Sequence, residues 1–396
     1  MTGDVADRAP AEERERAEQR VTWAELFFDL VWVFAITQIA VAVAHAHSVL
    51  DLATAIMLFL PLWMGWVGAA LLGNATGESL DGVHGRLLVF ALAACGLGMS
   101  VAVPEALGDR GVLFGVCYVL MRLILWQRMR RWPTFGGLRI EPFSVSLLAA
   151  GPLFLVGSFL DSGPRQLLWA LGAVIEVLGT ALLGKRLDRA RFETSHLPER
   201  FGLFVIMALG ETVIAAGGHV SEGHLGTVAL VTLGVAFVLI VLLWWAYFHY
   251  SAPAARHSLD QDPVQARIVR DVFSYAHLAY AVAIILMAVG LEELLAHPME
   301  HPHELPQLVL APGAALYLAG FCYARWRMFG APAVPRSTGV LACLGVAVAA
   351  PALPLLVTAV LVALVLAAVN GVEAFIVETG RPLPLLRVPG ARSARR

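Results

Sequence analysis

The chain has 396 residues, of which 59% are hydrophobic and 15% are charged, and its mean hydropathy is +0.74. A soluble globular domain carries roughly 25% charged residues, so this composition excludes an ordinary water-soluble enzyme or binding module. The formal net charge is −2, but the positive charges are distributed very unevenly along the sequence.

About twelve apolar segments of roughly 18 to 25 residues follow one another, each long enough to cross the hydrocarbon core of a bilayer. The sequence therefore predicts an all-α integral membrane protein. The predicted spans are residues 24–45, 50–73, 86–104, 112–130, 142–160, 166–184, 200–218, 225–249, 271–295, 308–327, 337–353 and 355–377.

The positive charges predict the orientation of these spans. The N-terminus, the even-numbered connections and the C-terminus, together with the span ends next to them, hold 25 of the 28 Lys and Arg residues, whereas the odd-numbered connections hold only Arg110 and Arg165. This split follows the positive-inside rule, so both termini are expected in the cytoplasm. Residues 1–20 are expected to form a disordered tail, and residues 381–396 a basic tail near anionic lipid rather than a nucleic-acid site.

The two halves of the chain resemble each other in the order of their motifs. "ELFFDLVWVFAITQIA" in the first half matches "ERFGLFVIMALGETVIA" in the second, "PLWMGWVGA" matches "LLWWAYFHY", and "YVLMRLILWQRMR" matches "YLAGFCYARWRMF". We therefore predict two six-helix repeats, 21–190 and 191–380. Because six is even, the repeats would be parallel, an arrangement in which transporters place their site near the repeat interface.

Ionisable residues inside the spans are the first candidates for function, because burying them costs several kcal/mol. The first span, "AELFFDLVWVFAITQ", carries Glu25 at the interface and Asp29 one helical turn deeper. Asp29 could carry a proton or hold a cation. Alternatively, it reaches the inner surface or pairs with an arginine of the connection 185–200.

The seventh span carries Arg200 at its start and Glu211 near its middle, eleven residues apart on nearly the same helix face. They are about 16 Å apart along the axis, too far to pair directly. We expect them to mark two depths of one polar path, with Asp29 at its cytoplasmic mouth and Glu211 as the leading candidate for the site.

Three further candidates lie deep in the bundle. Glu176 in span six falls opposite Glu373 in span twelve, so the two carboxylates could be repeat copies of one site. Arg122 is the one deep cation and needs an anionic partner, for which Glu176, Glu211, Asp29 and a substrate remain open. Its repeat counterpart is Phe321, so the halves differ here.

Other signals point less directly to chemistry. His277 could exchange a proton, but a lone helical histidine also suits hydrogen-bonded packing. Tryptophans and tyrosines near span ends are typical of interfacial belts: Trp63, Trp66, Trp244, Trp245, Tyr247 and Tyr250. No Walker A, GxSxG, HExxH or GxGxxG motif is present, so neither a cofactor nor a metal is expected and no catalytic residue is assigned.

Four motifs together resemble the bacterial low temperature requirement protein A family: "ELFFDLVWVFAITQ", "HLPERFGLFVIMALGET", "LLWWAYF" and "HLAYAVAIILMAVGLEELLAHP". The resemblance implies a multi-pass inner-membrane protein over about residues 20–378. The positions that it carries over are Glu25, Phe28, Asp29, His196, Glu199, Arg200, Gly210 and Glu211. The second span departs from the family's acidic, Trp-rich pattern.

The leading hypothesis is a proton- or cation-linked secondary transporter or channel that uses buried carboxylates. "FFDLVWVFAIT" is also similar to the Phe-Ser-Asp signature of a potassium-channel family built from six-helix repeats, which favours ion permeation slightly. One alternative is a membrane-embedded enzyme that acts on an isoprenoid or lipid by acid chemistry. Another is a structural or sensory membrane protein. The expected partners are membrane lipids and a small-molecule or ion substrate, and the sequence leaves a homo-oligomer open.

Overall fold

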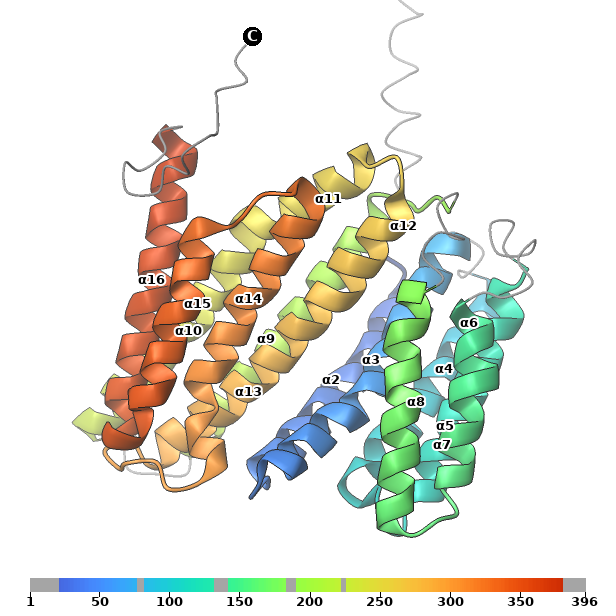
Figure 1. Ribbon diagram of the computed structural model, residues 1–396, viewed down its shortest axis with the longest axis horizontal. Coiled ribbons are helices and arrows are strands. Elements are labelled where there is room, and N and C mark those ends of the chain that lie inside the picture. The colour runs from blue at the N-terminus through green and yellow to red at the C-terminus, as the bar shows by residue number, and fades with distance from the viewer. Residues whose placement is uncertain (1–20, 77–81, 132–141, 183–189, 222–225, 380–396) are drawn as a thin grey trace, which may run out of the picture. The chain divides into compact units, whose positions relative to one another are not determined.

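The computed structural model describes residues 21–76, 82–131, 142–182, 190–221 and 226–379. Over these residues the regular structure is helical throughout, with no strand, as the sequence predicts (Figure 1). Both predicted tails, 1–20 and 381–396, lie outside the described residues.

The long helices fall at the predicted spans. They are α2 (Trp23–Ala44), α3 (Val49–Thr76), α4 (Val83–Ala102), α5 (Gly111–Met129), α8 (Ser162–Leu182), α9 (His196–Ser221), α10 (Thr227–Trp245), α13 (His277–Ala296), α14 (Leu310–Phe329), α15 (Val334–Ala349) and α16 (Leu355–Thr379). Short helices α6 (Pro142–Val145), α7 (Gly151–Gly157), α11 (Ala252–Gln261) and α12 (Gln265–Ile268) and the 3₁₀ turns η2 (Val103–Glu105), η7 (Leu305–Leu308) and η8 (Ala350–Ala352) complete them.

Three segments are π-helical: η3 (Ser146–Ala150), η5 (Ala246–Ser251) and η6 (Val269–Ala276). Each continues an α-helix at one or both ends, so each acts as a wide turn inside a longer helical segment. Such turns are common at functional sites because they redirect side chains and leave backbone carbonyls available.

Ten helices within the described residues are long and apolar enough to cross a membrane. The predicted fifth span is a shorter apolar segment, Pro142–Gly157, and α14 is not among the ten. The prediction of a helical, multi-pass membrane protein is thus supported, while the count of twelve spans and the position of the termini stay predictions.

The chain forms two compact units. Among the described residues, the first contains 21–42, Val49–Met207 and Ala254–Tyr275, and the second contains Val43–Ser48, Ala208–Pro253 and 276–379. The boundaries fall inside α2, α9 and α11, before α3 and at the end of η6, and not at the predicted repeat junction of residues 190 and 191. Since compactness is not a test of duplication, the two repeats stay a prediction.

The first unit is built around α3, which packs against α4, α5 and α8, while α5 and α8 also pack against α7. Its core is aromatic: Trp32, Trp63, Trp66, Tyr118 and Trp169 are fully buried. In the second unit α13 packs on α14, α14 on α15, and α16 on both α10 and α15. These helices place the polar side chains described below.

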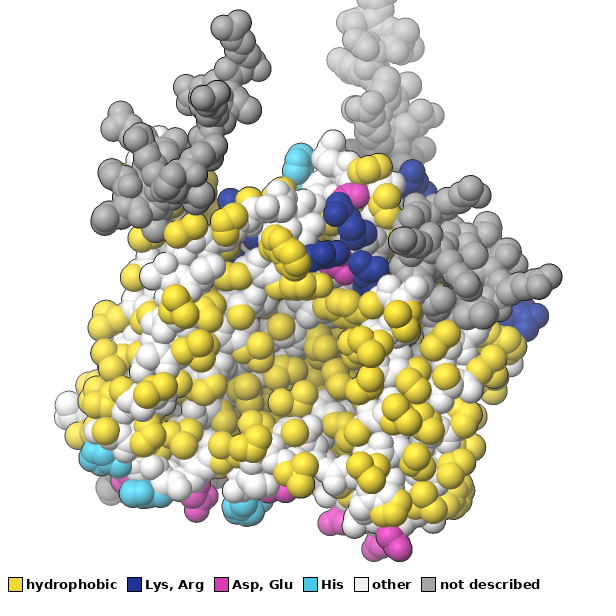
Figure 2. Space-filling model, in the orientation of Figure 1, with side chains coloured by type: hydrophobic (Ala, Val, Ile, Leu, Met, Phe, Trp, Pro, Cys, Tyr) yellow, Lys and Arg dark blue, Asp and Glu magenta, His cyan; other side chains and the backbone are white. Residues whose placement is uncertain are grey.

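Large apolar side chains face outward along the helices of both units. Side chains such as Leu30, Leu167, Leu182 and Val348 are more than half exposed, and hydrophobic atoms dominate the face drawn in Figure 2, whereas charged side chains gather near its edges. Soluble proteins rarely expose contiguous apolar surface of this extent. Exposed apolar side chains are favourable in lipid, so a lipid environment fits these helices.

Candidate functional site

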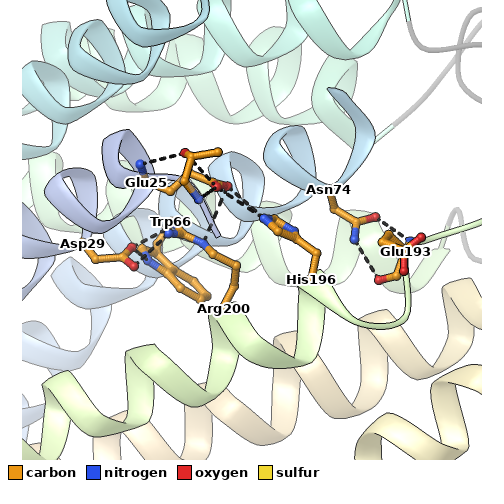
Figure 3. A network of polar contacts seen from close by, with 8 residues as sticks. Glu25, Asp29, Trp66, Asn74, Glu193, His196 and Arg200 are labelled. Atoms are coloured by element: carbon orange, nitrogen blue, oxygen red, sulfur yellow. Dashed lines mark hydrogen bonds and ion pairs between the residues drawn. The ribbon is translucent and has the colours of Figure 1, made fainter. Parts of the chain in front are cut away.

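A buried ion pair joins α2 and α9 in the first unit. Arg200 Nη1 and Nη2 donate to the two carboxylate oxygens of Asp29 at 2.8 and 2.9 Å (Figure 3). The indole Nε1 of Trp66 on α3 donates to the same carboxylate at 2.9 Å. Both charged side chains are 1% exposed. The forked geometry of the guanidinium suits two parallel hydrogen bonds to a carboxylate.

Glu25 extends this network toward the start of α2 and α9. His196 Nε2 lies 3.2 and 3.3 Å from the two Glu25 oxygens, and Arg200 Nε lies 3.9 Å from Oε1. The backbone N–H and hydroxyl of Thr22 donate to Oε2 at 2.9 and 3.1 Å. Gly73 on α3 allows the approach of this carboxylate, because a Cβ there would collide with Glu25 Oε1.

Four residues expected from the sequence therefore form one cluster: Glu25, Asp29, His196 and Arg200. Of the readings left open for Asp29, the structure places it against an arginine of the connection 185–200. Glu199, carried over with them, is exposed on the first turn of α9 and takes no part in these contacts. An acidic side chain at that position favours the helix dipole.

The sequence reasoning assigned Trp63 and Trp66 to an interfacial belt, and this was wrong. Both are fully buried, and each indole N–H has a partner: Asp29 for Trp66 and the Ser274 carbonyl for Trp63 at 3.0 Å. A buried indole must satisfy its N–H, so two tryptophans on one face of a span opposite a carboxylate are the signal that would have identified them.

A second buried ion pair lies between α5 and α8. Arg122 Nη2 donates to Glu176 Oε2 at 2.9 Å, and Nη1 donates to the Met64 carbonyl of α3 at 3.1 Å. The hydroxyls of Tyr118 and Ser146 donate to the other oxygen, Oε1. Ser146 is the first residue of the π-helical η3. The structure thus selects Glu176 among the partners that the sequence left open for Arg122.

This pair lines a pocket in the first unit. About 770 Å³ of space free of protein atoms, part of it open to the surroundings, lies among α3, α5, α8 and the segments 142–146 and 266–274. Its walls are mainly apolar, with polar groups at a few points. The lining residues that matter below are Met64, Arg122, Phe143, Ser146, Glu176 and Arg270. Arg122 and Glu176 lie six or seven residues from the last residues of α5 and α8, about 10 Å along the helix axes.

A third buried ion pair lies in the second unit. Arg336 of α15 donates to both oxygens of Glu373 on α16 at 2.6 and 2.7 Å, and also to the Ser251 hydroxyl and the Ala246 carbonyl. Its guanidinium lies 4.2 Å from the centre of the Phe321 ring. In the sequence, Arg336 falls in the connection before the predicted span 337–353. Its position one residue before that span is a weak signal that its side chain is buried.

The remaining candidates are less informative. Glu211 is buried, in the part of α9 that belongs to the second unit. His277 is buried beside Tyr247, whose hydroxyl lies 2.8 Å from His277 Nε2, as hydrogen-bonded packing requires, and a role of this histidine in proton exchange stays a prediction. No group of three metal-binding side chains occurs in the described part of the chain.

A family model described as "Bacterial low temperature requirement A protein (LtrA)" matches residues 20–370. An uncharacterized protein of Rhizobium meliloti (strain 1021) is 30% identical over 319 residues, which cover 78% of this chain and 78% of the relative. No solved structure matches the chain. The chain belongs to the LtrA family, as its motifs indicated, and is a multi-pass bacterial membrane protein.

Proposed function

We propose that this protein is a secondary transporter of the bacterial inner membrane that moves a small solute together with a proton or another cation. The observation that carries the proposal is the pocket of the first unit. Its walls are mainly apolar, a few polar groups converge on it, and it reaches a buried ion pair, which is the composition of small-molecule sites. Intramembrane ion pairs beside a cavity are typical of solute and ion pathways.

The same ion pair offers a way to couple solute and ion. Glu176 accepts hydrogen bonds from Arg122, Tyr118 and Ser146, and Arg122 is its counter-ion. A solute anion that draws Arg122 away from Glu176 would leave this carboxylate without its counter-ion, and uptake of a proton would then balance the charge. Binding of the solute and of the proton would be linked, and reciprocally so.

The polar path predicted from Asp29 to Glu211 enters this proposal in a modified form. Asp29 is held by Arg200 and the indole of Trp66, so it can exchange a proton only while that pair is open. We assign the Asp29–Arg200 pair to the cytoplasmic end of the pathway, and Glu211 stays the candidate for a second proton site.

Acid chemistry on a lipid or isoprenoid is less well supported. A catalytic acid must present a proton to its substrate. Both oxygens of Glu176 accept hydrogen bonds from protein donors, so in this arrangement neither oxygen presents a proton to a substrate.

The test is flux in proteoliposomes. Purified protein is reconstituted with entrapped pH- and potassium-sensitive dyes, and gradients of protons, potassium and pooled small solutes are imposed. We expect flux that depends on the protein and on a solute, and that is lost in Glu176→Gln and lowered in Glu211→Gln. Tyr317→Phe, which removes a buried hydroxyl from the second unit, is the control and should retain the flux.

Folded, correctly inserted protein that moves no ion and no solute under any gradient contradicts the proposal. Flux that Glu176→Gln leaves intact contradicts the assignment of the site to the pocket.

A further inference from the structure

The buried arginines differ in how completely their N–H groups are used. Arg165 donates five hydrogen bonds, all to backbone carbonyls, and Arg336 donates four. These two side chains act as structural clamps. Arg122 donates two, and its Nε, like that of Arg200 outside the pocket, has no hydrogen-bond partner among the described residues although the side chain is 2% exposed. A guanidinium has five N–H donors, so Arg122, which lines the pocket, has N–H groups that no described residue accepts.

Glu176, the other member of the ion pair, already accepts hydrogen bonds on both of its carboxylate oxygens. Glu176 accepts from Arg122 on one oxygen and from Tyr118 and Ser146 on the other. The polar end of the pocket therefore has spare donors, so it suits a ligand with acceptor atoms rather than a cation. A carboxylate is the acceptor group whose geometry matches a guanidinium edge best.

The apolar walls of the pocket determine which ligand can bind beyond its polar head. Val67, Leu71, Phe143, Ile175 and Val269 contribute apolar wall. A polar solute would lose its hydration there without replacement, whereas an aromatic or aliphatic body would gain from burial.

We infer that the pocket binds an amphiphilic monocarboxylate, whose head accepts hydrogen bonds from Arg122, and that Glu176 takes up one proton as the ligand enters. The proton relieves the repulsion between two carboxylates on one guanidinium and keeps the charge of the site unchanged. This inference rests on the proposed function for its site but not for its test.

The groups around Glu176 support this balance. Tyr118 and Arg122 face it from α5, and the neutral Ser146 faces it from η3. From η6, Arg270 also lines the pocket and donates to Asp271 at 2.6 Å. Within the described residues, Glu176 is the only carboxylate that lines the pocket, so it is the group that receives the proton.

The test is binding to protein in lipid nanodiscs, with three probes that share one apolar body. These probes are 4-phenylbutyrate, 4-phenylbutylamine and 4-phenylbutan-1-ol, titrated by calorimetry at neutral pH. We expect saturable binding of the carboxylate, at least about tenfold tighter than binding of the amine or alcohol. A second arm supplies palmitate with the lipid. Binding of the soluble probe identifies a solute from water, and binding of palmitate alone identifies a membrane-derived fatty acid.

The proton is counted from the difference in binding enthalpy between phosphate and Tris buffers. We expect about one proton per carboxylate bound by the wild type. Glu176→Gln should bind the carboxylate at least as tightly, because Arg122 then lacks an anion, but should take up no proton. The double variant Arg122→Gln/Glu176→Gln, which buries no unpaired charge, should lose the preference for the carboxylate. Tyr317→Phe should behave as the wild type does.

Equal binding of the three probes, no binding of any carboxylate, or proton uptake that persists in Glu176→Gln would overturn the inference. These results do not depend on transport. Carboxylate binding without flux leaves the inference standing and contradicts the transporter, whereas flux without carboxylate binding does the reverse.

Discussion

Replacing Asp29 with Asn tests whether the ion pair of α2 and α9 is the structural unit that its geometry indicates. The substitution keeps the shape of the side chain but removes the charge that faces Arg200 at 2.8 Å. Arg200 is 1% exposed and would remain as a buried cation. Removal of one partner from a buried ion pair costs about 3–5 kcal/mol, because the other charge is left uncompensated.

Glu25 reduces this penalty. Its Oε1 lies 3.9 Å from Arg200 Nε, and two opposite charges about 4 Å apart attract each other by about 4 kcal/mol at an effective dielectric constant near 20. Part of that attraction already exists in the wild type, so we place the loss for Asp29→Asn near the lower limit, at about 3 kcal/mol. The double variant Asp29→Asn/Arg200→Gln, which removes both charges, should recover most of it.

The assay is equilibrium unfolding in mixtures of mild detergent and SDS, followed by helicity and tryptophan fluorescence. The double-mutant cycle gives the coupling between the two residues directly. If Asp29→Asn unfolds within about 0.5 kcal/mol of the wild type, or if the two substitutions are additive, Asp29 is not held by Arg200. The reading of Asp29 as a free proton or cation site would then return.

Three further predictions use the same assay. Trp66→Phe removes a donor to a carboxylate and should cost about 1–2 kcal/mol, more than Trp32→Phe, whose indole donates to a neutral carbonyl; equal losses would contradict the assignment. Arg165→Lys cannot replace five hydrogen bonds with three donors and should cost at least about 2 kcal/mol; a smaller loss would show that the clamp is not needed. Arg336→Ala should destabilise the protein by about 3 kcal/mol, and adding Phe321→Arg should restore part of the loss. No recovery would contradict the view that Arg336 supplies the cation for which position 321 is the repeat counterpart.

The sequence predicted the class of fold because the long apolar segments and the uneven distribution of Lys and Arg both indicated a multi-pass membrane protein. The long helices begin and end close to the bounds of the predicted apolar segments. This agreement is expected because a chain in lipid must satisfy its backbone hydrogen bonds within each helix. The same logic gave the cluster on α2 and α9. Charged residues inside apolar segments need partners, and Glu25, Asp29, His196 and Arg200 found theirs within one network.

The partners themselves were harder to predict. Ser146 reaches Glu176 through a π-helical turn, and no sequence pattern distinguishes that turn from regular helix. Trp66 was misread because an aromatic residue near a span end has the same sequence signature whether it faces lipid headgroups or a buried carboxylate. Pairing across helices depends on how they rotate about their axes, which the weakly amphipathic spans of a membrane protein do not specify.

The ion pairs of the two units bear on the predicted repeat. Sequence alignment sets Glu176 opposite Glu373 and Arg122 opposite Phe321, which suggested that the second half lacks the cation. In the structure Arg336 supplies it from α15 and places its guanidinium on the face of the Phe321 ring.

Each unit thus holds a carboxylate of the sixth or twelfth predicted span against an arginine, and each arginine also donates to a backbone carbonyl of the second or eighth: Met64 for Arg122 and Ala246 for Arg336. After a duplication, the arginine of the ion pair could be replaced by one on another helix, provided that the carboxylate and the backbone carbonyl that it contacts are retained. The two arginines differ in their hydrogen bonds, because Arg336 donates from its Nε to Glu373, whereas the Nε of Arg122 has no partner among the described residues. If the halves share an origin and the first binds the carboxylate that we propose, the second has kept the ion pair as a clamp and the first has kept it as a binding group.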